Sequence, residues 1–292
     1  MVHLTIDIGN TATKAAVHAV MPEAEAGADR LKATAPLRHR SVKGHDLAWL
    51  PDFVGNDEVG ACIVSSTIDM TDDMLRSINS LSIPRVIRLN AQTPIPIRNG
   101  YETPETLGPD RLAAAIGAYF ECVCRTGEHR PVLVVDAGTA ITYDLVTADG
   151  HYLGGNISPG INLRLLALHE HTAHLPLVAP LQLPPIGGGK RVSEKENTSS
   201  PVLPSPPMGR NQRGAIGTTT QTAILHGVLD GVRHEIEGFI CEYSIKYPKL
   251  SVFFTGGDME NFSESIKKRI FADKLLVSKG LDIILQYNQA SH

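Results

Sequence analysis

The sequence predicts an α/β protein made of two related halves with a cleft between them. Two distant segments share one design, an apolar strand that ends in Asp-x-Gly and continues into a second strand. Four of the eleven positions are identical when these segments are aligned, namely Asp7 with Asp136, Gly9 with Gly138, Thr13 with Thr142 and Val17 with Val146. Each half also contains a segment with the apolar periodicity of a helix. A repeated unit of strand, turn and strand indicates a duplicated fold.

The first half begins with a predicted hairpin and ends with a predicted helix. The hairpin strands are Val2 to Ile8 and Lys14 to Val20. The stretch 107–125 predicts the helix, because Pro109 suits a first helical turn and apolar residues recur on one face. That face consists of Leu112, Ala113, Ile116, Tyr119, Phe120 and Val123. We expect this half to form one lobe over residues 1–125.

The second half repeats the hairpin at Val132 to Val146 and continues into a long amphipathic helix within 216–243, whose opening is rich in threonine. Its apolar positions are Ile224, Leu225, Val228, Val232, Ile236, Phe239 and Ile240. A further strand then runs into Gly256 and Gly257, and a helix is expected after them. We expect the second lobe to cover residues 130–292.

Two stretches have the composition of insertions. Residues 21–36 are small and charged, whereas residues 184–214 are dense in Pro, Gly and Ser. The second stretch cannot supply a packed core, so we expect it to be a flexible loop.

Composition excludes several classes of protein. The chain has 292 residues, 42% of them hydrophobic, and a formal net charge of -4 without a long block of one sign. We therefore expect no nucleic-acid partner and no membrane surface. Its four cysteines lack the spacing of a zinc site or a disulfide framework, and the first residues lack the features of a signal peptide. The expected location is the cytoplasm.

The two Asp-Gly turns have the residue types that a polyphosphate requires. Backbone N–H groups of a tight glycine turn can approach phosphate oxygens, and the carboxylate can hold the accompanying metal. An ordinary hairpin turn explains either motif alone. Two such turns and the glycine pair at "FFTGGD" together favour a clamp for phosphates, with the third turn against a flat base.

Five motifs occur in order along the chain: "DIGNTATK", "GPDR", "DAGTAITYD", "GGNISPG" and "TGGD". In this order and spacing the chain resembles the type III pantothenate kinases, within the superfamily of actin, hexokinase and heat-shock ATPases. The resemblance implies a duplicated ribonuclease H-like, actin-like ATPase fold. It also implies ATP-dependent phosphorylation of pantothenate to 4'-phosphopantothenate, the first step of coenzyme A biosynthesis. Two alternatives stay open: a kinase of another small alcohol, and a non-catalytic regulator like the Bvg accessory factors of the same family.

The resemblance also implies how ATP and its cations bind. Asp7 would lie near Mg²⁺, directly or through water, and Asp136 would bind a monovalent cation, K⁺ or NH₄⁺. The implied ATP-binding residues are Asp7, Ile8, Gly9, Asn10, Thr11, Ala12, Thr13, Lys14, Thr139, Gly256 and Gly257. Two other motifs are set aside, because the histidines in "LHEHTAHLP" lack metal-site spacing and "GGGKR" lacks the remainder of a P-loop.

The implied pantothenate-binding residues are Tyr101, Gly108, Pro109, Asp110, Arg111 and Thr220, the last reaching over from the other subunit of a homodimer. Asp110 matches the general base, and Arg111 suits the pantothenate carboxylate. The start of a helix favours the ionised form of Asp110 and weakens it as a base. We therefore expect Asp110 to act mainly by orienting the acceptor hydroxyl.

Overall fold

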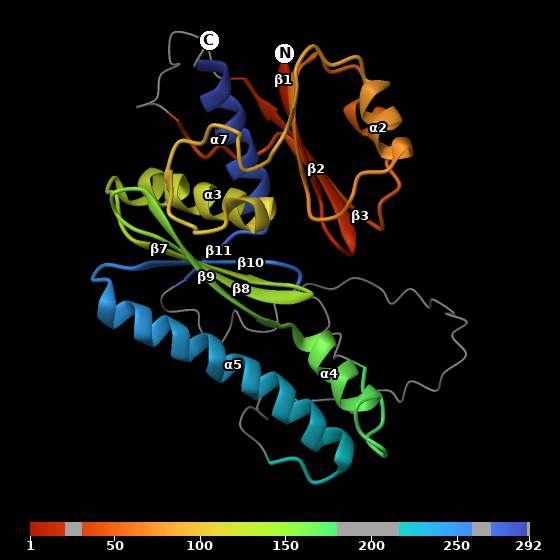
Figure 1. Cartoon of the computed structure of the whole chain (residues 1–292), viewed down its shortest axis with the longest axis vertical. Helices are drawn as coiled ribbons and strands as arrows, with labels where there is room; N and C mark the ends of the chain where they lie inside the picture. The colour runs from red at the N-terminus through yellow and green to blue at the C-terminus, as the bar shows by residue number, and fades with distance from the viewer. Residues whose placement is uncertain (21–30, 180–215, 259–269, 291–292) are drawn as a thin grey trace.

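Two mixed β-sheets of the same design form the framework of the molecule (Figure 1). The computed structural model describes residues 1–20, 31–179, 216–258 and 270–290. The predicted insertion at 184–214 and the helix expected after Gly257 lie outside these residues. Of the predicted insertion at 21–36, residues 31–36 are described and have no regular secondary structure.

The first sheet has the strand order β3-β2-β1-β4-β5. Its strands are β1 (Val2–Ile8), β2 (Ala12–Ala19), β3 (Arg38–Lys43), β4 (Val59–Ser66) and β5 (Val86–Arg88). β1, β2 and β3 pair antiparallel, whereas β4 and β5 are added in parallel on the other side of β1. The predicted N-terminal hairpin is therefore confirmed, with its second strand beginning at Ala12.

The second sheet has the order β11-β10-β7-β8-β9-β6. Its strands are β6 (Arg98–Asn99), β7 (Val132–Ala137), β8 (Ala140–Val146), β9 (His151–Pro159), β10 (Ser251–Thr255) and β11 (Ile270–Ala272). β7, β8 and β9 pair antiparallel, and β10 and β11 are added in parallel beside β7. Apart from β6, this sheet repeats the first one strand for strand. Asp7 and Asp136 hence occupy equivalent places near the ends of equivalent strands.

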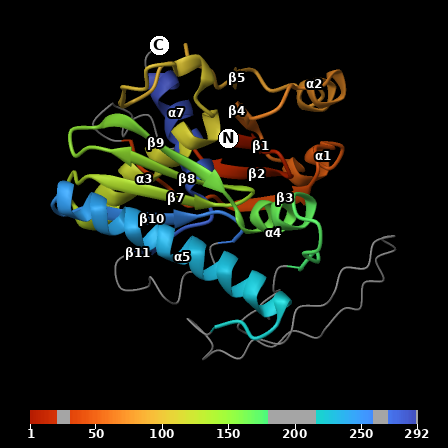
Figure 2. The same ribbon diagram turned by 60° about the horizontal axis from the view of Figure 1, so that its bottom comes forward.

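Helices cover both faces of each sheet. α3 (Pro109–Thr126) and α7 (Leu276–Ala290) lie between the sheets, as Figures 1 and 2 show. α1 (Leu50–Val54) and α2 (Asp72–Asn79) pack on the outer face of the first sheet, and α4 (Ile161–Glu170) and α5 (Thr220–Lys246) on the outer face of the second. A short 3₁₀ helix, η3 (Pro104–Thr106), precedes α3. No helix in the described part of the chain is both long and apolar enough to cross a bilayer.

Strand β7 shows why this layering follows from the sequence. Val132 and Val134 are wholly buried in the core that contains α3 and α7, while Leu133 and Val135 are wholly buried in the core that contains α5. Alternate side chains of a strand point to opposite faces. A strand covered on both faces therefore needs the uninterrupted apolar run that precedes Asp136.

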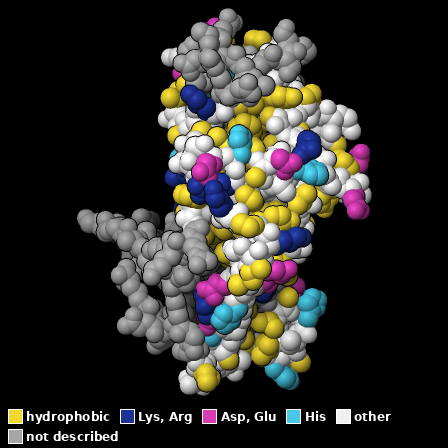
Figure 3. Space-filling model, turned by 90° about the vertical axis from the view of Figure 1, so that its left-hand side faces the viewer, with side chains coloured by type: hydrophobic (Ala, Val, Ile, Leu, Met, Phe, Trp, Pro, Cys, Tyr) yellow, Lys and Arg dark blue, Asp and Glu magenta, His cyan; other side chains and the backbone are white. Residues whose placement is uncertain are grey.

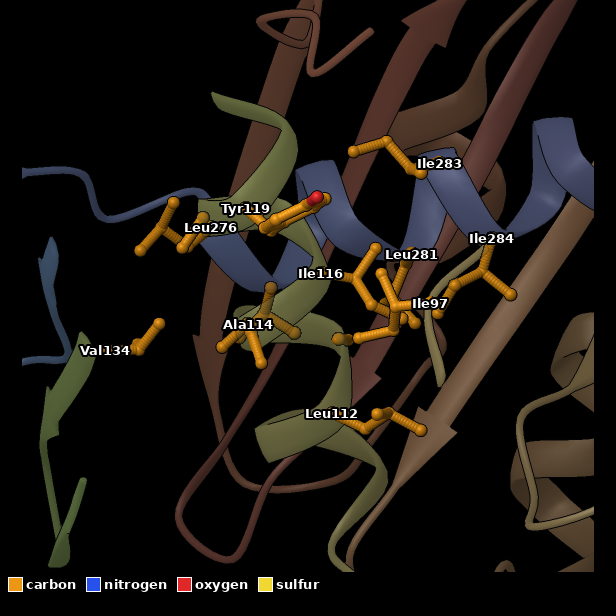
Figure 4. Packing of buried hydrophobic residues seen from close by; sticks show 14 of the residues in the cluster. Ile97, Leu112, Ala114, Ile116, Tyr119, Val134, Leu276, Leu281, Ile283 and Ile284 are labelled. Atoms are coloured by element: carbon orange, nitrogen blue, oxygen red, sulfur yellow. The ribbon is translucent and has the colours of Figure 1, made fainter. Parts of the chain in front are cut away.

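Two glycines allow α3 and α7 to cross closely, next to the buried residues drawn in Figure 4. A Cβ atom on Gly117 would lie 2.2 Å from the backbone oxygen of Leu276, and one on Gly280 would lie 1.8 Å from that of Ala113. α3 itself begins with Gly108 as the N-cap and Pro109 in its first turn, and it ends at the left-handed Gly127. Its observed bounds confirm the predicted helix.

Candidate active site

The first Asp-Gly turn joins β1 to β2 and is held by hydrogen bonds to residues outside the hairpin. Within the turn, Gly9 N donates to Ala12 O at 3.0 Å. The loop after β3 adds three hydrogen bonds: Gly44 N donates to Thr11 O at 2.9 Å, Thr13 Oγ1 donates to Gly44 O at 2.9 Å, and His45 Nε2 donates to Gly9 O at 3.0 Å. The turn is therefore held in one shape by groups that do not themselves belong to the hairpin.

The second turn joins β7 to β8 and has the third glycine turn packed against it. Gly138 N donates to Ala140 O, and Asp258 N, just after β10, donates to Ala137 O at 2.9 Å. Gly256 has a φ of +97°, and a Cβ atom there would lie 2.5 Å from Asp136 Oδ1. Only glycine fits this conformation and this contact. The structure thus brings the predicted positions Thr139, Gly256 and Gly257 to one end of the second sheet, beside Asp136.

The start of α3 carries the predicted acceptor-binding residues. Asp110 Oδ1 accepts a hydrogen bond from Arg111 N at 2.9 Å. The Arg111 guanidinium is buried, with Nε and Nη2 both donating to Asp144 of β8, the shortest contact being 2.7 Å. Tyr152 Oη also donates to Asp144 Oδ1 at 2.7 Å, and the Tyr101 ring centroid lies 5.8 Å from Arg111 Cζ. A cavity of about 310 Å³ opens beside Pro109.

Three carboxylates from separate elements act on one another electrostatically. Burial raises the pKa of Asp7 to about 6, and the charge of Asp110 adds to this rise while Lys14 opposes it. Burial likewise raises the pKa of Asp136 to about 7, helped by Asp110 and Asp7 and again opposed by Lys14. Lys14 Nζ is 3.9 Å from Asp7 Oδ2. Crowded, poorly solvated carboxylates of this kind favour a bound cation.

Sequence reasoning missed three residues near these carboxylates. Asp144 is the last residue of the motif "DAGTAITYD". Thr142 pairs with Asp136 across the hairpin, and Asp144 lies two residues after Thr142, so strand alternation could have placed Asp144 on the same face of the sheet. His45 and Ser65 gave no signal, because only the folded chain brings them to Asp7 and its turn.

Thr220, by contrast, is not brought to Asp110 within this chain. It is exposed in the first turn of α5, behind the capping box of Thr219 and Thr222. α5 packs on the face of the second sheet that is opposite to α3.

The family model of type III pantothenate kinase matches residues 3–242. The chain belongs to the type III pantothenate kinase family. A type III pantothenate kinase of Bacteroides fragilis is 39% identical over 286 residues, which cover 98% of each chain. A Phocaeicola vulgatus relative of the same name is 36% identical with the same coverage. A Christiangramia forsetii relative is 35% identical over 78% of this chain and 79% of its own.

Solved structures of lower identity support the fold of this family member. A Campylobacter jejuni protein named for the Baf family of transcriptional activators aligns with a TM-score of 0.52 at 19% identity, over 98% of each chain. The activator of 2-hydroxyisocaproyl-CoA dehydratase from Clostridium difficile, with bound ADPNP, gives 0.50 at 12% identity, over 100% of this chain and 96% of its own. With the repeated sheet topology, these similarities confirm the predicted duplicated α/β fold of two related lobes.

Proposed function

We propose that this chain transfers the γ-phosphoryl group of ATP to the primary hydroxyl of pantothenate, in the cytoplasm, as the first step of coenzyme A biosynthesis. The observation that carries this proposal is the convergence of Asp7, Asp110 and Asp136, which come from two equivalent turns and the start of α3. Phosphoryl transfer needs positioning and charge neutralisation more than covalent chemistry. Membership of the type III pantothenate kinase family supports pantothenate as the acceptor.

The two turns are proposed to hold the nucleotide. Residues 7–14 present the backbone N–H groups of a braced turn to the phosphates, and Thr139, Gly256 and Gly257 lie along the nucleotide. The donor set fits the cations that the family implies, because Asp7 Oδ1 is buried with no hydrogen-bond partner beyond the Ser65 hydroxyl among the described residues. Asp7 would hold Mg²⁺ and Asp136 would hold K⁺ or NH₄⁺. When bound, these cations neutralise charge on the phosphates.

Asp110 and Arg111 are proposed to hold the acceptor. Asp110 orients the pantothenate hydroxyl and accepts its proton late in the transfer. Arg111 Nε and Nη2 already donate to Asp144. Arg111 can therefore bind the pantothenate carboxylate only through its remaining N–H groups. Asp144 thereby fixes the plane of the guanidinium beside Tyr101. Gly108 and Pro109 shape the helix start, and Thr220 of a second copy completes the site across a homodimer.

The test is identification of the product. Mass spectrometry of a reaction with ATP, Mg²⁺ and K⁺ should show phosphopantothenate. A parallel screen of glucose, glycerol and other small alcohols should show little product. Equal turnover of an unrelated alcohol would assign the chain to a different kinase activity.

A further inference from the structure

Ser65 on β4 is the direct neighbour of Asp7 on β1. The two strands are parallel and pair Asp7 with Ser65 in register. Side chains of in-register neighbours project from the same face of a sheet. The Ser65 side chain is wholly buried, and its hydroxyl lowers the pKa of Asp7 against the larger effect of burial. The hydroxyl is thus directed at the carboxylate.

The facing oxygens of these two residues have no partner beyond each other. Apart from the contact of the Ser65 hydroxyl with the Asp7 carboxylate, neither Asp7 Oδ1 nor Ser65 Oγ has a hydrogen-bond partner among the described residues. The Lys14 ammonium group does not fill this role, because Lys14 Nζ lies 3.9 Å from the other carboxylate oxygen, Asp7 Oδ2. Ser66, next along the chain, is satisfied, since its Oγ donates to Ile68 O at 2.7 Å. A buried carboxylate that meets only one hydroxyl is poorly solvated, so such a pair in a native core requires an explanation.

The chemistry of the pair indicates what would satisfy it. A carboxylate oxygen and a hydroxyl oxygen are hard ligands of the kind that Mg²⁺ selects, and Mg²⁺ keeps several of its waters when bound to a protein. The pair lies near the end of β1, where the chain enters the first Asp-Gly turn at Gly9. A divalent cation that accompanies a nucleotide there would meet both oxygens.

We propose that Ser65 Oγ and Asp7 Oδ1 together hold the divalent cation of the bound nucleotide, directly or through one of its waters. This inference rests on the proposed function and adds a residue to its cation site. Removing the Ser65 hydroxyl should weaken cation binding while the ligand-free protein stays folded.

The experiment compares Ser65→Ala with the matched control Ser66→Ala and with wild type. Thermal unfolding without ligands should show that Ser65→Ala still unfolds in one cooperative transition, so that a change in cation binding can be assigned to the lost hydroxyl. Binding of Mn²⁺, followed by electron paramagnetic resonance with a non-hydrolysable ATP analogue and no pantothenate, should weaken about tenfold for Ser65→Ala. Ser66→Ala should bind Mn²⁺ like wild type.

Unchanged Mn²⁺ affinity in Ser65→Ala would overturn the inference. So would a Ser65→Ala variant that fails to fold, since the hydroxyl would then support the fold. The proposed function can fail independently of this inference. If wild type makes no phosphopantothenate but its Mn²⁺ binding depends on Ser65, the cation site stands and pantothenate is not the acceptor.

Discussion

At the scale of single residues, the site depends on charged and polar groups held at the ends of buried strands. Asp7 and Asp136 occupy equivalent positions in two copies of one hairpin, and burial raises the pKa of each well above its ordinary value. The ligand-free protein therefore carries an electrostatic cost that a bound cation would relieve.

This cost gives the ligand-free protein a specific pH dependence. The folded-state pKa of Asp136, about 7, lies above its unfolded value, so the favourable contribution is complete below about pH 4 and is lost as the pH rises through 7. In buffers with only bulky organic cations, the unfolding midpoint of wild type should fall more between pH 5 and pH 8 than that of Asp136→Asn. Adding K⁺ at pH 8 should restore wild type alone. Equal K⁺ shifts for both proteins would remove Asp136 from the cation site.

His45 should influence ATP binding through the turn that it braces. His45→Ala removes the donor to Gly9 O, so the KM for ATP should rise several-fold while the KM for pantothenate changes little. His45→Gln places an N–H near the same point and should recover much of the loss. His39→Ala, an exposed histidine on β3, is the control. Equal KM values for ATP in His45→Ala and wild type would show that the bond does not shape the turn.

At the scale of elements, the hairpins, α3, α5 and β10 were predictable, because strand alternation, Asp-Gly turns and a 3.6-residue apolar period are local signals. Most of β4 and α7 carried no such distinguishing signal. Their positions are set by packing between the sheets, and α7 meets α3 and β1 only after the chain has returned from the second sheet. The pairing of Arg111 with Asp144 was likewise not predictable, since it joins a helix start to a strand that follows it in sequence.

The α3–α7 crossing should be intolerant of any added side chain. Gly117→Ala places a Cβ atom against the Leu276 carbonyl, so the free energy of unfolding should fall by about 1–3 kcal/mol despite the better helix propensity of alanine. Gly238→Ala in α5 is the matched control, because a Cβ atom there has open space. It should stabilise by about 0.5–1 kcal/mol. Chemical denaturation measures both, and similar signs for the two variants would show that the crossing relaxes.

At the scale of the whole molecule, the two sheets and the helices between them bring three carboxylates from separate parts of the chain together. Acidic and basic side chains are interspersed in small groups with apolar ones on the face drawn in Figure 3. Among the described residues, this face offers no broad field of one sign.

A homodimer should be needed for full activity. Thr220 lies in α5, across the second sheet from α3, so within one chain it is not beside Asp110. Sedimentation should therefore give about twice the chain mass of 31.5 kDa. A fully active monomer would be incompatible with Thr220 acting from the second copy.

The central claim is tested most directly by ADP release with and without pantothenate, measured for wild type and Asp110→Asn by a coupled assay. Wild type should release ADP only when pantothenate is present. Asp110→Asn keeps the size of the side chain but loses its charge, so kcat should fall by about 10² or more with little change in ATP binding. ADP release that does not depend on pantothenate, or near-normal turnover by Asp110→Asn, would contradict the assignment.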